Sequence, residues 1–118
     1  MKGMGVSFRE KGNILFIRLS GELDHHQAEE IRRRTDRRIE EKDILDLVFD
    51  CEEVRFMDSS GIGFVMGRYR KVKEKGGRAV ILGTSSYADA IFEMAGIYQI
   101  IKKCSDEKQA LAYCRQER

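Results

Sequence analysis

The chain has 118 residues, of which 42% are hydrophobic and 36% charged, and its net charge is +2. This length and composition predict one water-soluble globular domain over residues 1–118 and exclude a disordered chain. No apolar run reaches the roughly 20 residues that cross a bilayer, and residues 1–5 lack the apolar core of an export signal. The three cysteines show no C-x-x-C spacing. We therefore expect a cytoplasmic protein with no membrane contact, metal or other cofactor.

The first third of the sequence predicts a β-hairpin followed by a helix. Residues 6–10 and 14–19 have the pattern of strands joined by a short glycine-containing turn. Residues 20–23 break the strand pattern, and Asp24 then offers a favoured helix N-cap. The side chains that would face a core recur from there at helical spacing, at Ala28, Ile31, Thr35 and Ile39.

The rest of the chain alternates strands with helices. In order, we expect a strand over 45–49, a loop over 50–58, a helix with an apolar stripe over 62–72, a strand over 78–82, a helix over 86–95 capped by Ser86, a strand over 98–101 and a helix around 110–114. An opening hairpin followed by this alternation predicts the α/β class. The sheet would be mixed but mostly parallel, with four or five strands and about four covering helices.

Basic residues concentrate in two stretches, 32–38 and 68–75. Acidic residues interleave with the first stretch, and no aromatic residues interleave with either as base-stacking platforms would. We interpret both stretches as the solvated faces of amphipathic helices and expect no binding of nucleic acid.

Polar residues gather where two of the predicted parallel strands end. Ligands and partners of open α/β sheets favour the carboxyl ends of the strands. The segments 20–24 and 50–60 both leave such ends, so neighbouring strands would bring their polar residues together. These residues are Asp24, His25, His26, Asp58, Ser59 and Ser60.

Several functions are compatible with two serines at a helix start. Helix capping explains one of the oxygens. A serine hydrolase using Ser59 with Asp24 and His25 is an alternative, but the G-x-S-x-G frame is absent and the histidines precede the serines. A small-molecule or nucleotide site is a further alternative, although Gly61-x-Gly63 lacks the rest of a phosphate-binding loop.

The helix after the serines contains three glycines, at positions 61, 63 and 67. Their spacing predicts that they share one side of the helix, opposite Val65 and Tyr69. Such a side either packs closely against another segment or forms an open surface on which a protein can lie. Phe64 does not belong to the apolar stripe of this helix. If the glycine side is an open surface, Phe64 would be an exposed anchor for the partner.

Phosphorylation is the remaining possibility for the two serines. The free N–H groups and partial positive charge at a helix N-terminus favour anions. A phosphate on Ser59 or Ser60 would add roughly −1.5 to −2 charges where the fold tolerates them. The fold would survive while the neighbouring surface changed its charge, as a reversible interaction switch requires.

Two segments, RLSGELDHH at 18–26 and VRFMDSSGIGFVMGRYR at 54–70, resemble the STAS-domain anti-anti-sigma factors, in particular their sporulation branch. The similarity extends from the hairpin to the last helix. It implies a small mixed sheet covered by helices, with the switch serine at a helix N-terminus.

The resemblance also implies a regulatory function without catalysis. The unphosphorylated protein would bind an anti-sigma factor, release a sporulation sigma factor and be monomeric when free. The anti-sigma factor would act as the serine kinase that phosphorylates Ser59 and ends binding, and a serine phosphatase would reverse this. The residues expected to contact the partner are Gly21, Glu22, Asp24, His25, Asp58, Ser60, Gly61, Ile62, Gly63, Phe64 and Gly67.

Overall fold

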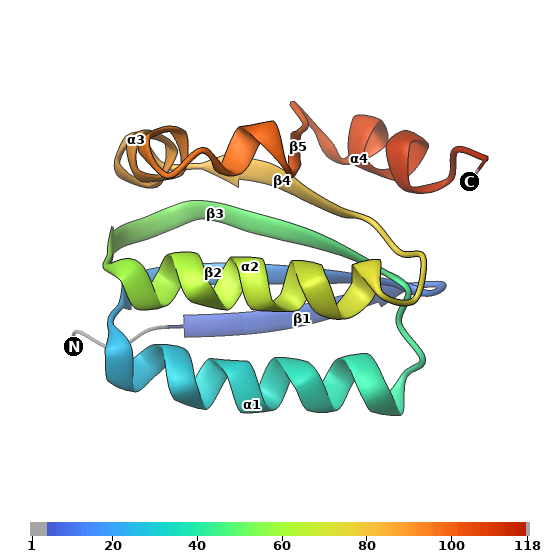
Figure 1. Cartoon of the computed structure of the whole chain (residues 1–118), viewed down its shortest axis with the longest axis horizontal. Coiled ribbons are helices and arrows are strands. Elements are labelled where there is room, and N and C mark those ends of the chain that lie inside the picture. The colour runs from blue at the N-terminus through green and yellow to red at the C-terminus, as the bar shows by residue number, and fades with distance from the viewer. Residues whose placement is uncertain (1–4, 118) are drawn as a thin grey trace.

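The computed structural model describes residues 5–117, in which five strands form one mixed sheet (Figure 1). Four of the residues that would carry an export signal, 1–4, lie outside this range. The strands follow one another in sheet order as in the sequence. They are β1 (Gly5–Lys11), β2 (Ile14–Leu23), β3 (Asp46–Met57), β4 (Ala79–Thr84) and β5 (Lys102–Lys103). β1 pairs antiparallel with β2, and all other pairs are parallel, so the predicted hairpin and mixed α/β sheet are confirmed.

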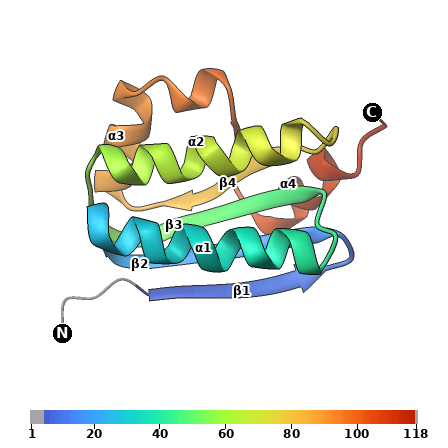
Figure 2. The same cartoon turned by 60° about the horizontal axis from the view of Figure 1, so that its bottom comes forward.

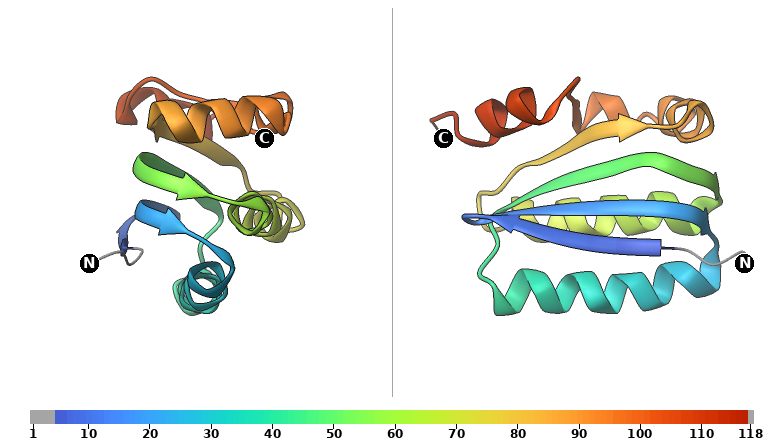
Figure 3. Two further views of the ribbon diagram at one scale, coloured as in Figure 1. Left: turned by 90° about the vertical axis from the view of Figure 1, so that its left-hand side faces the viewer. Right: turned by 180° about the vertical axis from the view of Figure 1, so that it is seen from behind.

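Helices cover both faces of the sheet. The described helices are α1 (His25–Glu41), α2 (Ser59–Lys73), α3 (Ser86–Met94) and α4 (Glu107–Cys114), with a 3₁₀ turn, η1, at Ile97–Gln99. α1 and α2 lie side by side along one face (Figure 2), and the end-on view in Figure 3 shows both on the same side of the strands. α4 packs on the opposite face. No helix in residues 5–117 is both long and apolar enough to cross a membrane.

The alternation of side chains along β2 divides the interior into two cores. Leu15, Ile17 and Leu19 point towards α1 and α2 and belong to the larger core. Ile14 and Phe16 point to the other face, where α4 covers them. A strand buried on both faces reads as a continuous apolar run, as residues 14–17 do.

β2 and β3 extend further than the sequence pattern predicts. Residues 20–23 belong to β2, and residues 50–57, expected as a loop, belong to β3. Register shifts interrupt the pairing beyond Arg18 and beyond Phe49. Such irregularities break the strict period of two. The far half of β3 also carries exposed charged residues at Glu52, Glu53 and Arg55, so this part of the strand resembles a loop in sequence.

The expected strand over 98–101 is also wrong. η1 ends at Gln99 within this segment, a turn follows it, and β5 begins only at Lys102. The N-cap of α3 is Ser85 rather than Ser86, because the Ser85 hydroxyl accepts a hydrogen bond of 3.0 Å from the Ala88 N–H. Either serine could cap the helix from sequence alone. The geometry of the β4–α3 connection selects the first.

Candidate functional site

The carboxyl ends of β2 and β3 lie together, as the sequence predicts. Leu23, the last residue of β2, pairs with Met57, the last residue of β3. α1 and α2 therefore begin next to each other. The imidazole of His25 reaches across, with its Nδ1 3.4 Å from the Ser60 hydroxyl.

An aspartate caps each of the two helices. The Asp58 carboxylate accepts a hydrogen bond of 2.8 Å from the Ser60 N–H, and the Asp24 carboxylate accepts one of 3.0 Å from the Gln27 N–H. Both acids therefore satisfy helix N–H groups, which fixes where the helices start. The capping interpretation accounts for Asp58 and leaves the two serine hydroxyls to be explained.

Ser59 is the first residue of α2, and its side chain is exposed. Among the interactions of residues 5–117, its hydroxyl has no hydrogen-bond partner, in contrast to the neighbouring Ser60. A free hydroxyl at the positive end of a 15-residue helix can accept a phosphoryl group without breaking an existing contact.

The expectation that Phe64 is exposed is wrong. Its ring is only 3% exposed and packs edge-to-face on Phe49 of β3, with the ring centroids 6.1 Å apart. α2 contacts both the sheet and α1, so its buried side is wider than the single stripe read from the sequence. Phe64 belongs to this side together with Gly61, Val65, Arg68 and Val72.

The three glycines of α2 do not share one environment. A Cβ at Gly61 would lie 2.9 Å from Met57 Cβ and 3.0 Å from Leu23 Cδ2, so this glycine lets α2 approach the ends of both strands. At Gly63 and Gly67 a Cβ would meet no atom within 4 Å. Close packing therefore explains the first glycine, and an open surface is left beside the other two.

This difference predicts opposite effects of two equivalent substitutions. Gly61→Ala should lower the free energy of unfolding by about 1–3 kcal/mol, because the new methyl overpacks a site whose neighbours include a Cβ that cannot rotate away. Gly63→Ala, in the same helix, should raise it by about 0.5–1 kcal/mol through helix propensity. Urea unfolding of both variants measures the effects, and an equal change in both would contradict the packing described here.

A groove runs between α1 and α2 from the serine corner. Its volume is about 230 Å³. At its far end Arg68 Nε and Asp36 Oδ1 form an ion pair at 2.9 Å, although the two atoms are not aligned for a hydrogen bond. Burial lowers the pKa of Arg68, and the nearby Asp36 carboxylate opposes this effect. The second basic stretch is therefore not wholly solvated. The groove is lined by His25, Ala28, Glu29, Arg32, Ser60, Gly63, Phe64 and Arg68.

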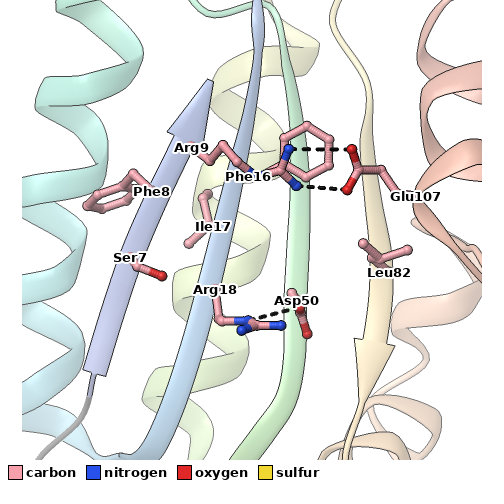
Figure 4. A pocket seen from close by; sticks show the side chains of 9 residues that line it. All are labelled: Ser7, Phe8, Arg9, Phe16, Ile17, Arg18, Asp50, Leu82 and Glu107. Carbon is pink, nitrogen blue, oxygen red and sulfur yellow. Dashed lines mark hydrogen bonds and ion pairs between the residues drawn. The ribbon is translucent and has the colours of Figure 1, made fainter. Parts of the chain in front are cut away.

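A larger hollow, of about 490 Å³, lies on the face of the sheet opposite α1 and α2 (Figure 4). Its charged side chains pair with one another: Arg9 with Glu107 at 2.8 Å and Arg18 with Asp50 at 3.2 Å. None of Ser59, Asp24 or His25 lines it. The groove between α1 and α2 is lined by His25 but not by Ser59 or Asp24. Neither of these two hollows holds all three residues, so the alternative of a small-molecule enzyme built on them is not favoured.

Of the other predicted contact residues, Gly21 is buried in β2 with a φ of +87°, a conformation that glycine adopts without strain. Glu22 is partly exposed beside it, and Ile62 is partly exposed on α2. The sequence predicts the α3 helix but not its place at the site, where Ile91 and Met94 border Ser59. The sequence signal that could have indicated this is the unusually apolar composition of the short segment 86–94.

Comparison with known proteins agrees with this geometry. Residues 6–110 match the STAS domain family. The chain is 34% identical to the anti-sigma F factor antagonist of Paenibacillus polymyxa, over 90% of this chain and 91% of that protein. It superposes with a TM-score of 0.81 and 30% identity on the anti-sigma factor antagonist SpoIIAA in its unphosphorylated form, covering 94% and 96% of the two chains.

The Bacillus cell fate determinant SpoIIAA in its phosphorylated form is also similar, with a TM-score of 0.74 and 30% identity over 94% of this chain and all of that one. These matches extend across both segments that carry the sequence resemblance, and they include the hairpin, the sheet and the helices described above. The chain therefore belongs to the STAS-domain family, among its anti-sigma factor antagonists.

Proposed function

We propose that this chain is an anti-sigma factor antagonist switched by phosphorylation of Ser59. The unphosphorylated chain binds an anti-sigma factor and so frees a sporulation sigma factor, and the phosphorylated chain does not bind. The observation that carries this proposal is the exposed, unpartnered Ser59 hydroxyl at the start of α2. The relatives named as antagonists, and the existence of unphosphorylated and phosphorylated SpoIIAA, support it.

The proposed contact surface surrounds Ser59 on the ends of β2, β3 and the first turns of α2. Gly21, Gly61 and Phe64 are buried and shape this surface from beneath. The open side of α2 at Gly63 and Gly67 lets a partner approach the helix backbone. The side chains proposed to touch the partner are Glu22, Asp24, His25, Asp58, Ser60 and Ile62.

Phosphorylation ends binding through local electrostatics. The phosphate places roughly two negative charges next to Asp58, on a surface that docks when it carries a neutral hydroxyl. Burying an unmatched charge in an interface costs several kcal/mol, and about 2.7 kcal/mol already weakens affinity a hundredfold. The fold itself tolerates the phosphate because the N-terminus of α2 favours anions.

The enzymes of this phosphorylation cycle are other proteins. The anti-sigma factor is the serine kinase, a separate serine phosphatase restores the hydroxyl, and the chain itself has a regulatory role. It works in the cytoplasm as a monomer when free, with neither nucleic acid nor membrane as a partner.

The test is phosphorylation with the cognate anti-sigma factor and Mg-ATP, followed by peptide mass spectrometry. We expect one phosphate, on Ser59. Ser105→Ala is the matched control, since it removes an exposed serine hydroxyl outside the proposed contact surface and should leave phosphorylation in place. A phosphate found only at other positions, or a Ser59→Ala variant phosphorylated as fully as wild type, would overturn the proposal.

A further inference from the structure

An apolar groove lies between the first turn of α2 and one side of α3. Its volume is about 320 Å³. Ser59 forms part of its wall, and Asp58 is the charged residue in the lining. The complete lining is Met57, Asp58, Ser59, Ile62, Ile91, Met94 and Ala95.

α3 presents apolar side chains on two sides. Ala88 and Phe92 point into the main core and are fully buried. Tyr87, Ile91 and Met94 follow the spacing i, i+4, i+7 and form a second stripe. Met94 is 82% exposed. A helix that is apolar on several sides is typical of a buried helix. Here the main core covers Ile91 in part, whereas Tyr87 and Met94 stay exposed in the described chain.

The second stripe continues onto β3. The ring of Phe56 stacks on that of Tyr87, with centroids 6.0 Å apart and an interplanar angle of 25°. Three of the four large hydrophobic side chains that are exposed in the described chain lie on α3 or stack against it, namely Tyr87, Met94 and Phe56. The fourth, Ile100, lies outside α3, and of the four Met94 is the one that lines the groove. Contiguous exposed apolar surface of this kind marks a binding site for another protein.

We propose that this groove receives an apolar side chain of the anti-sigma factor and that Met94 is its principal contact, an inference that rests on the proposed function. The partner is identified by the groove's continuity with the proposed contact surface around Ser59. Because Ser59 and Asp58 form one wall, a protein that covers Ser59 also lies over the groove. The Asp58 carboxylate at its edge favours a partner side chain flanked by lysine or arginine.

The groove also refines the account of the switch. A phosphate on Ser59 stands at the lip of an apolar cavity, where it requires water that the docked side chain would exclude. Phosphorylation then opposes docking in two places, at the polar corner around Ser60 and in the groove itself.

The test measures the dissociation constant of the anti-sigma factor for Met94→Ala, Met94→Lys and the matched control Ile100→Lys. Met94→Ala should bind about tenfold more weakly than wild type, Met94→Lys weaker still, and Ile100→Lys like wild type. Because Met94 and Ile100 are both exposed, urea unfolding should give unchanged stability for all three variants.

Wild type and Ser59-phosphorylated wild type are measured alongside, which separates the two proposals. If phosphorylation weakens binding but both Met94 variants bind like wild type, the groove proposal is overturned and the proposed function stands. If unphosphorylated wild type does not bind the anti-sigma factor, or binds it equally when phosphorylated, the proposed function fails and this inference fails with it.

Discussion

Replacing Ser59 with aspartate is expected to weaken binding of the anti-sigma factor about a hundredfold or more. Ser59→Ala should bind like wild type and remain bound in the presence of ATP. Aspartate adds a charge beside Asp58 on the docking surface, whereas alanine keeps the surface neutral and removes only the acceptor of the phosphate. The stability of Ser59→Asp should stay the same or rise slightly, because acidic residues are favourable in the first turn of a helix.

Isothermal titration calorimetry of both variants measures this effect. Ser105→Asp is a suitable control, because Ser105 is exposed and lies just before α4, away from the serine corner. It should change the affinity little, which separates a local charge from a change in net charge. Equal affinities for Ser59→Asp and Ser59→Ala would contradict the electrostatic account of the switch.

Replacing Phe64 with alanine is expected to lower the free energy of unfolding by about 3–5 kcal/mol. The ring is almost fully buried between α2 and the sheet, where it contacts Phe49, and its removal leaves a cavity. Domains of this size are stable by about 5–15 kcal/mol, so the variant should be strongly destabilised. Its melting temperature should fall by roughly ten degrees or more.

Urea unfolding of Phe64→Ala, with Met94→Ala as the exposed counterpart, measures this effect. Met94→Ala should unfold like wild type because Met94 is mostly in solvent. If Phe64→Ala instead kept its stability and lost only affinity, the ring would be the exposed anchor that the sequence pattern suggests, and the packing of α2 described here would be wrong.

The sequence by itself determined the elements that depend on local chemistry. The hairpin follows from the glycine-containing turn between two apolar runs, and the start of α1 follows from Asp24, whose carboxylate caps the helix as predicted. Capping was also expected at the start of α2, where the structure assigns it to Asp58. Two parallel strands with polar residues after their carboxyl ends were enough to predict that Asp24, His25 and the serines gather at one edge. The resemblance of the same segments to the STAS-domain antagonists identified the family.

Only the tertiary structure decided which surfaces are covered. Helical spacing says which residues share a side, but the number of elements that pack on a helix determines how much of it is buried. α2 contacts both the sheet and α1, so Phe64 and Arg68 are buried. α3 is covered on one side alone, so Met94 is left in solvent beside Ser59. Burial depends on contacts between segments far apart in the chain, and a local pattern does not contain them.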